Sequence, residues 1–114
     1  MTTVKFALDE KDNITEFSAK GHSGYAEEGS DIVCAAVSAC IQMLEKSIAQ
    51  VIGEKKASFK VLDDAEIVFL LPENISGEER KSIEYMLKGF LGYMQEISKH
   101  YEDFLKVELE VKKC

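Results

Sequence analysis

The sequence predicts an α+β fold in which two long helices pack on a mostly antiparallel sheet of about five strands, in the order ββαββαβ. Apolar residues recur at helical spacing over residues 31–52 and again over 77–99. Five shorter segments carry alternating or continuous apolar residues and are separated by turn residues, as strands are. Because 114 residues suffice for one hydrophobic core, we expect a single domain over residues 1–114.

The first two strands are expected over residues 2–9 and 14–20, joined by a turn at 11–13. In the first strand, three apolar residues alternate with small or polar ones: Val4, Phe6 and Leu8. In the second strand, one face is expected to carry Thr15, Phe17 and Ala19. The two strands should form an antiparallel hairpin that leads the chain to the first helix.

The first helix is expected over residues 31–52, with Gly53 as its C-cap. At about 100° per residue, its apolar stripe centres near four positions: Val33, Val37, Cys40 and Leu44. Cys34 then lies at the edge of the stripe, partly exposed, and shares its face with Ser38 one turn later. Cys40 is expected to be a buried small hydrophobe.

Two strands follow, over about residues 57–62 and 65–71. The second is almost continuously apolar, which is typical of a central strand covered on both faces, and Pro72 ends it. The last strand, over residues 104–112, alternates apolar and charged residues.

The second helix is expected to begin after a capping box formed by Ser76 and Glu79 and to run to about residue 99. Gly89 and Gly92 each cost the helix about 1 kcal/mol relative to alanine. Such a cost indicates the close approach of another element at this point, and a second subunit is one candidate.

The composition limits the classes of partner. The chain has 14 Lys and Arg against 21 Asp and Glu, a net charge of -7, which argues against direct nucleic-acid binding and fits a basic protein substrate. We expect no secretory signal at the start of the chain and no apolar run as long as a membrane span. We therefore expect a cytoplasmic protein with no membrane partner and with its 3 cysteines reduced. No zinc-finger spacing or phosphate loop is present, so neither a metal nor a cofactor is expected.

A histidine and a cysteine flank the loop before the first helix. Cys34 falls within the first turns of that helix, where the helix dipole favours a negative charge. A neighbouring imidazolium such as that of His22 would also lower the pKa of a thiol, and the thiolate is the form that attacks. Gly21, Gly24 and Gly29 permit unusual backbone angles and let a ligand approach the main chain. The stretch therefore offers both devices that activate a cysteine nucleophile, with His22 as the candidate general base.

Spacing alone leaves other interpretations open. Cys34 can be a structural cysteine, with His22 an ordinary loop residue. Ser30 and Asp31 can cap the helix, and Asp31 can instead orient the histidine. A redox-sensing thiol is a further alternative, although a buried Cys40 on another face would offer no resolving partner.

The stretch from residue 21 to residue 38 forms a long motif. It consists of Gly21-His22, Gly24-Tyr25-Ala26, Gly29 and Asp31-Ile32-Val33-Cys34-Ala35-Ala36-Val37-Ser38. This motif resembles that of the ribosomal-processing cysteine protease family, and the length and element order extend the resemblance over the whole chain. The resemblance implies a cysteine endopeptidase with Cys34 as nucleophile and His22 as general base, assisted by Asp31 and Ser38.

The resemblance also implies a substrate and a partner. Members of that family remove a short N-terminal extension from large-subunit ribosomal protein twenty-seven, a basic protein, next to aromatic residues. Gly21, Gly24 and Tyr25 would then help to position the substrate, with an apolar pocket beside Tyr25. The family's habit of forming homodimers implies a homodimer. The alternative from another class is a ribosome-assembly protein that binds this substrate without cutting it.

Overall fold

The structure, a computed structural model, describes residues 1–21, 30–57, 59–62 and 66–112, without the side chains of Ser30 and Asp31. The elements in chain order are β1 (Thr2–Leu8), β2 (Ile14–Lys20), α1 (Ser30–Ile52), β3 (Lys60–Val61), β4 (Ile67–Leu70), α2 (Gly77–His100) and β5 (Leu105–Val111). The predicted α+β class and the order ββαββαβ are therefore confirmed.

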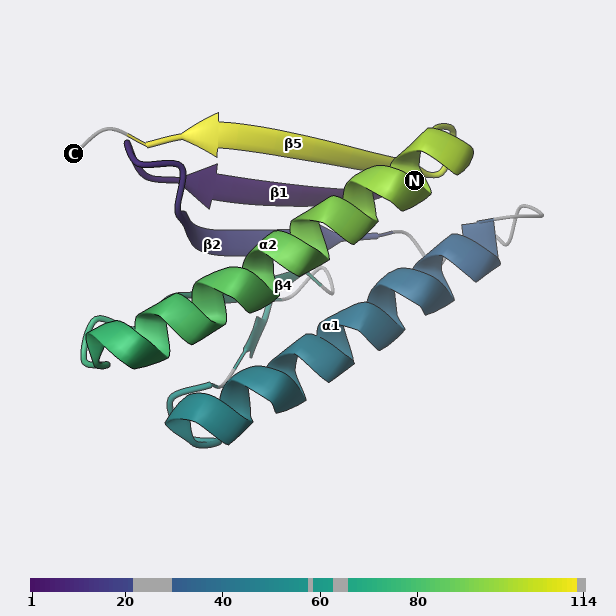
Figure 1. Cartoon of the computed structure of the whole chain (residues 1–114). Coiled ribbons are helices and arrows are strands. Elements are labelled where there is room, and N and C mark those ends of the chain that lie inside the picture. Colours follow the sequence, from purple (N-terminus) through teal and green to yellow (C-terminus); the bar gives the residue numbers. More distant parts are fainter. Residues whose placement is uncertain (22–29, 58, 63–65, 113–114) are drawn as a thin grey trace.

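The five strands form one mixed sheet in the order β3-β4-β2-β1-β5. β1 pairs antiparallel with β2 and parallel with β5, while β4 pairs antiparallel with β2 and β3. Both helices lie on the same side of this sheet and run in opposite directions, so the fold has two layers (Figure 1). The prediction that residues 65–71 are covered on both faces is wrong, because Phe69 is buried on the helix side but Leu70 remains 53% exposed.

The β1–β2 hairpin contains an irregularity that the sequence did not reveal. Ala7 pairs with Glu16 but Leu8 pairs with Ile14, so Thr15 is an extra residue in β2. This bulge brings Ile14 onto the core face and leaves Thr15 only partly buried, with its hydroxyl donating to the carbonyl of Ala7 at 3.3 Å. The expectation that Thr15 shares the face of Phe17 and Ala19 is therefore wrong.

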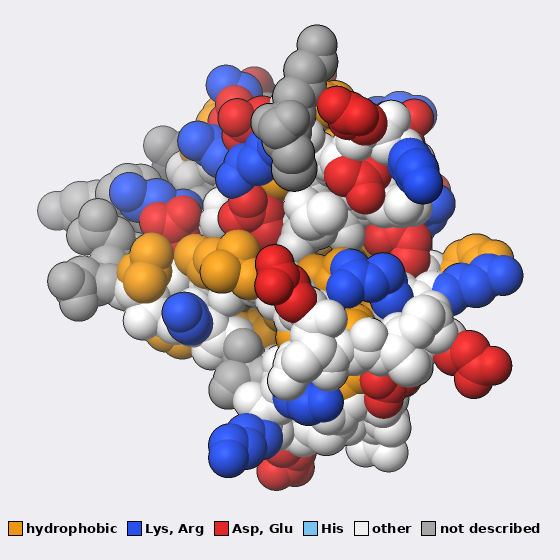
Figure 2. Space-filling view, turned by 90° about the vertical axis from the view of Figure 1, so that its left-hand side faces the viewer, with side chains coloured by type: hydrophobic (Ala, Val, Ile, Leu, Met, Phe, Trp, Pro, Cys, Tyr) orange, Lys and Arg blue, Asp and Glu red, His pale blue; other side chains and the backbone are white. Residues whose placement is uncertain are grey.

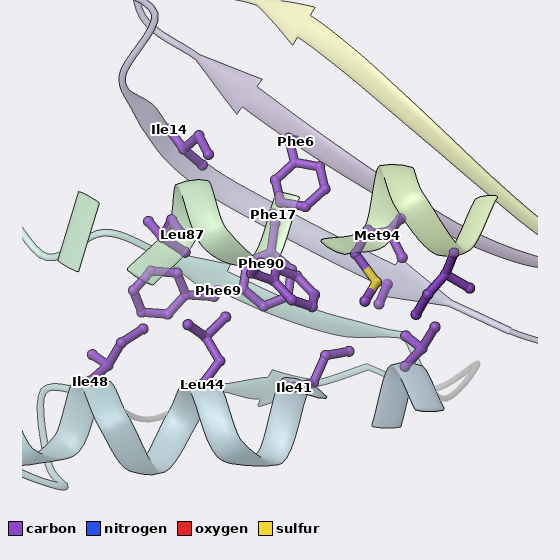
Figure 3. Close-up of a cluster of buried hydrophobic side chains, with 14 of the residues drawn as sticks. Phe6, Ile14, Phe17, Ile41, Leu44, Ile48, Phe69, Leu87, Phe90 and Met94 are labelled. Carbon is purple, nitrogen blue, oxygen red and sulfur yellow. The ribbon is translucent and has the colours of Figure 1, made fainter. Parts of the chain in front are cut away.

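Aromatic side chains form the centre of the core between the sheet and the helices. The ring of Phe17 lies 6.0 Å from Phe6, 5.9 Å from Phe69, 5.6 Å from Phe59 and 5.0 Å from Phe90. Apolar side chains from both helices close around these rings (Figure 3). They are Ile41, Leu44 and Ile48 of α1, and Leu87 and Met94 of α2.

The buried stripe of α1 has a different centre from the predicted one. The buried residues of the helix are Val33, Val37, Ile41, Leu44 and Ile48. At about 100° per residue, Cys34 and Cys40 each lie about 60° from the centre of this stripe, on opposite edges. Both cysteines are partly buried, so the prediction of partial exposure is confirmed for Cys34 and the prediction of full burial is wrong for Cys40. Burial raises the pKa of the Cys40 thiol.

The helix ends largely follow the sequence signals. Gly53 follows α1 with a φ of 88°, and its amide donates to the carbonyl of Ala49 at 2.8 Å, as expected for a glycine C-cap. The capping box of Ser76 and Glu79 is present at the start of α2.

Gly89 and Gly92 do not mark a close approach within the chain. A Cβ atom added at either position would meet no atom within 4 Å among the residues that the structure describes. The expectation of an intramolecular contact is therefore wrong, and a second subunit at this face stays a prediction.

By length and composition, residues Ile32–Ile52 of α1 are apolar enough to cross a membrane, contrary to the sequence-based expectation. One side of this helix packs against the core, and core helices commonly meet the same criteria.

At the end of the molecule where α1 ends and α2 begins, acidic and basic side chains alternate with hydrophobic ones (Figure 2). The excess acidic charge is therefore not gathered into one patch on this face.

We expect Phe17→Ala to lower the free energy of unfolding by about 3–5 kcal/mol, because it leaves a cavity at the centre of the aromatic cluster. Leu70→Ala, at an exposed position of the neighbouring strand, should change it by no more than about 0.5 kcal/mol. Urea denaturation of both variants measures the difference. Equal losses would show that the cluster does not dominate the core.

Glu84 of α2 gives the fold a pH-dependent contact. Its two carboxylate oxygens accept from the amide of Ile14 at 3.0 and 2.8 Å. Burial raises the pKa of this carboxyl from its ordinary 4.5, against the lowering effects of the Ile14 hydrogen bond and of Lys88. The contribution of Glu84 to the free energy of unfolding is thus present below pH 4.5, where its carboxyl is protonated, and is lost as the pH rises through the folded-state pKa.

We therefore compare the melting temperature of Glu84→Gln with that of the unmodified protein at two pH values. The difference should shift in favour of Glu84→Gln when the pH is raised from about 4 to about 7, because the glutamine amide keeps an acceptor for Ile14 without a buried charge. Thermal denaturation at the two pH values measures the gap between the proteins. A gap that does not change with pH would contradict the assignment.

Candidate active site

The predicted nucleophile lies where three elements meet. β1 begins, β2 ends and α1 begins at the same end of the molecule (Figure 1). Cys34 is the fifth residue of α1, which begins at Ser30, one residue earlier than predicted. The thiol is therefore close to the positive end of the helix dipole, as the sequence indicated.

A pocket of about 180 Å³ opens beside Cys34. Gly21 and Ser38 line the same pocket, so three of the predicted site residues lie together, and Cys34 and Ser38 share a face as expected. Most of the remaining wall is apolar, and among the described lining residues Lys20 is the charged one. The other lining residues are Thr2, Ala19, Val37, Ile41 and Ile67.

The thiol of Cys34 has a hydrogen-bond partner, Thr2, that the sequence did not predict. The hydroxyl oxygen of Thr2 lies 3.3 Å from the sulfur of Cys34, and either atom can donate in the neutral state. Thr2 is only 5% exposed, whereas Cys34 is partly exposed, so the contact is partly buried. The alternating pattern of β1 could have indicated that Thr2 is buried, because Thr2 lies on the same face of the strand as the buried Val4 and Phe6. Thr2 also begins the strand that pairs with the end of β2.

Gly21 fits against Thr2. A Cβ atom added at Gly21 would lie 2.9 Å from the hydroxyl oxygen of Thr2 and 3.5 Å from its methyl carbon. Gly21 does not have a positive φ, so the expectation that it supplies an unusual backbone angle is wrong. A glycine is needed here for space.

The remaining predicted site residues fall outside the described part of the chain. His22, Gly24 and Tyr25 belong to residues 22–29, and of Asp31 only the backbone, in the first turn of α1, is described. The pairing of His22 with Cys34 and the caps at Ser30 and Asp31 therefore stay predictions.

The second cysteine of α1 has different surroundings. Cys40 lies beside Met43, Tyr85, Phe90 and Tyr93 in a groove between α1 and α2. Over residues 1–21, 30–57, 59–62 and 66–112, no group of three His, Cys, Asp or Glu side chains could hold a metal ion.

Comparison with known proteins identifies the family of this fold. Residues 1–106 match the family described as cysteine protease Prp. The ribosomal processing cysteine protease Prp of Bacillus subtilis is 26% identical over 98 residues, which cover 86% of this chain and 88% of that protein.

Solved structures share the fold. SMU.848 from Streptococcus mutans superimposes with a TM-score of 0.78 at 19% identity, covering 98% of this chain and 96% of its own. The essential ribosomal processing protease Prp of S. aureus, in complex with a substrate peptide, has a TM-score of 0.76 at 20% identity and covers 98% of this chain and 100% of its own. At these identities the superpositions establish the architecture.

We expect Gly21→Ala to lower the free energy of unfolding by about 1–3 kcal/mol, because the new methyl group overlaps the Thr2 hydroxyl. The same substitution in a Thr2→Ala background should cost less, since the overlapping atoms are gone. Chemical denaturation of the two single variants and the double variant measures this coupling. Strictly additive losses would show that Thr2 does not set the size limit at position 21.

Proposed function

Because this chain belongs to the Prp family of cysteine proteases, we propose that it is an endopeptidase in which Cys34 is the nucleophile and His22 the general base. The observation that carries the proposal is the position of Cys34. Its thiol lies near the start of α1, partly exposed, beside a pocket and next to a hydroxyl donor.

The proposed reaction begins with proton transfer from Cys34 to His22. The thiolate attacks the carbonyl carbon of the scissile peptide bond, and the carbonyl oxygen takes the negative charge. Backbone amides near the start of α1 are suited to stabilise this oxyanion, since the first amides of a helix have no partner within the helix. His22 returns its proton to the leaving amine, and water then hydrolyses the thioester.

Other motif residues would support this chemistry. Ser38 lines the pocket and is exposed, and we assign its hydroxyl the task of holding the substrate backbone. We assign Asp31 the task of orienting His22 or capping the helix, and Tyr25 that of bordering the site of an aromatic substrate residue. Gly21 and Gly24 would let the substrate approach the main chain.

We further propose that the substrate is the N-terminal extension of large-subunit ribosomal protein twenty-seven. The name of the Bacillus subtilis relative, a ribosomal processing protease, supports this assignment. The S. aureus structures with a substrate peptide and with a covalently linked product peptide support a peptide as the ligand. The net charge of -7 suits a basic substrate.

We also propose that the protein acts as a homodimer in the cytoplasm. The groove between α1 and α2 supports the dimer, because its rim carries the exposed apolar residues Met43, Tyr85 and Tyr93. Processing of a newly made ribosomal protein would take place in the cytoplasm, where cysteine thiols stay reduced.

We expect Cys34→Ala to abolish cleavage of the ribosomal protein that carries its extension, because the alanine side chain has no nucleophilic atom. Cys40→Ala removes the same atoms from the opposite edge of the apolar stripe and should retain cleavage. Intact-mass measurement of the substrate after incubation with each variant detects the loss of the N-terminal peptide.

Cleavage by Cys34→Ala would disprove the assigned nucleophile. A stable complex without cleavage by the unmodified protein would instead favour a role in binding alone. Circular dichroism of both variants verifies that they are folded.

A further inference from the structure

We propose that Thr2 is a positioning residue for Cys34: its hydroxyl donates a hydrogen bond to the thiolate and holds the sulfur at the pocket. This inference rests on the proposed role of Cys34 as the nucleophile. It adds to the site a residue that lies outside the motif of residues 21–38.

The first argument is the geometry of the contact. The oxygen and sulfur atoms are 3.3 Å apart, a normal distance for a hydrogen bond that involves sulfur. Thr2 is 5% exposed, whereas Cys34 is partly exposed beside the pocket. Thr2 and Cys34 both line the pocket, so the bond lies in the pocket wall, and the exposed part of Cys34 remains available to a substrate.

The second argument is the chemistry of the two partners. A neutral thiol can donate to the Thr2 oxygen or accept from it, but a thiolate has no proton and can only accept. Ionisation of Cys34 thus fixes the direction of the bond. A hydrogen bond to a charged group is stronger than one between neutral groups, so the contact favours the thiolate over the thiol.

The third argument is that Thr2 is itself held in place. Its amide donates to the carbonyl of Phe104 at 2.9 Å, and β1 pairs with β5 from Leu105 onward. On the other side, Gly21 leaves just enough space for the hydroxyl. Threonine is also stiff at χ1. The bond to Cys34 consequently ties the start of α1 to the sheet.

The charged groups around the Cys34 thiol are the same in every Thr2 variant proposed below. From the end of β2, Lys20 lines the pocket, while β4 contributes the uncharged Ile67 and α1 the uncharged Ser38. The side chains of His22 and Asp31 are outside the described part of the chain. Substitution at Thr2 removes only a hydroxyl group and changes no charge.

The test compares Thr2→Val, which keeps the shape of threonine but lacks the hydroxyl, with Thr2→Ser, which keeps the hydroxyl. Alkylation of Cys34 by iodoacetamide is followed across pH by peptide mass, with Cys40 as internal reference. We expect Thr2→Val to raise the pH midpoint of Cys34 alkylation by about 1 unit and to lower kcat about 10-fold with little change in KM. Thr2→Ser should stay close to the unmodified protein. Thr3→Val, at the next residue of β1, is the matched control and should change neither quantity.

Two results would overturn the proposal. One is a Thr2→Val protein whose Cys34 alkylates with the unmodified pH midpoint. The other is an equal loss of kcat in Thr2→Val and Thr2→Ser, which would mean that Thr2 acts through packing of the strand. If valine disturbs folding, Thr2→Ala removes the same hydroxyl without adding volume. Because alkylation requires no substrate, these results remain separate from the Cys34→Ala cleavage assay that tests the proposed function.

Discussion

The antiparallel register of β1 and β2 is the constraint on which both the core and the site depend. This alignment pairs Phe6 with Phe17 and places both rings beneath the helices. The same alignment brings Gly21 against Thr2 at the other end of the hairpin. A slip of one residue would turn Phe17 to the open face of the sheet and carry the Thr2 hydroxyl away from the thiol, because successive strand residues point to opposite faces. The packing that stabilises the fold thus also aligns the candidate site.

The rotational position of α1 gives its two cysteines different surroundings. Ile41, Leu44 and Ile48 point into the aromatic cluster and set the orientation of the helix (Figure 3). Cys34 then faces the end of the sheet, near the start of the helix and beside a hydroxyl donor. Cys40 faces the groove towards α2, where burial raises the pKa of its thiol. Two residues of the same type therefore have different surroundings through their position on one helix.

The sequence predicted most of the local structure and the place of Cys34 near the start of α1, but not the contacts between distant elements. Helical periodicity placed Cys34 and Ser38 on one face, and the structure finds both beside one pocket. The bulge at Thr15 was not predictable, since it depends on how β1 and β2 pair. The contact of Thr2 with Cys34 joins residues 32 positions apart and arises only when α1 docks on the sheet. Periodicity describes one element at a time, whereas these two features belong to pairs of elements.

The contact between β1 and the end of β2 explains why the first residue of the motif is a glycine. Gly21 was interpreted as a source of backbone freedom, yet its φ is not positive and the nearest atom to an added Cβ is the hydroxyl oxygen of Thr2. The small size of Gly21 protects the position of Thr2, and Thr2 in turn contacts Cys34. The space left by Gly21 after β2 therefore affects the position of the Cys34 sulfur through the side chain of Thr2. The thiol thus contacts a side chain of the sheet, and in the proposed mechanism the adjoining motif residues supply the general base and bind the substrate.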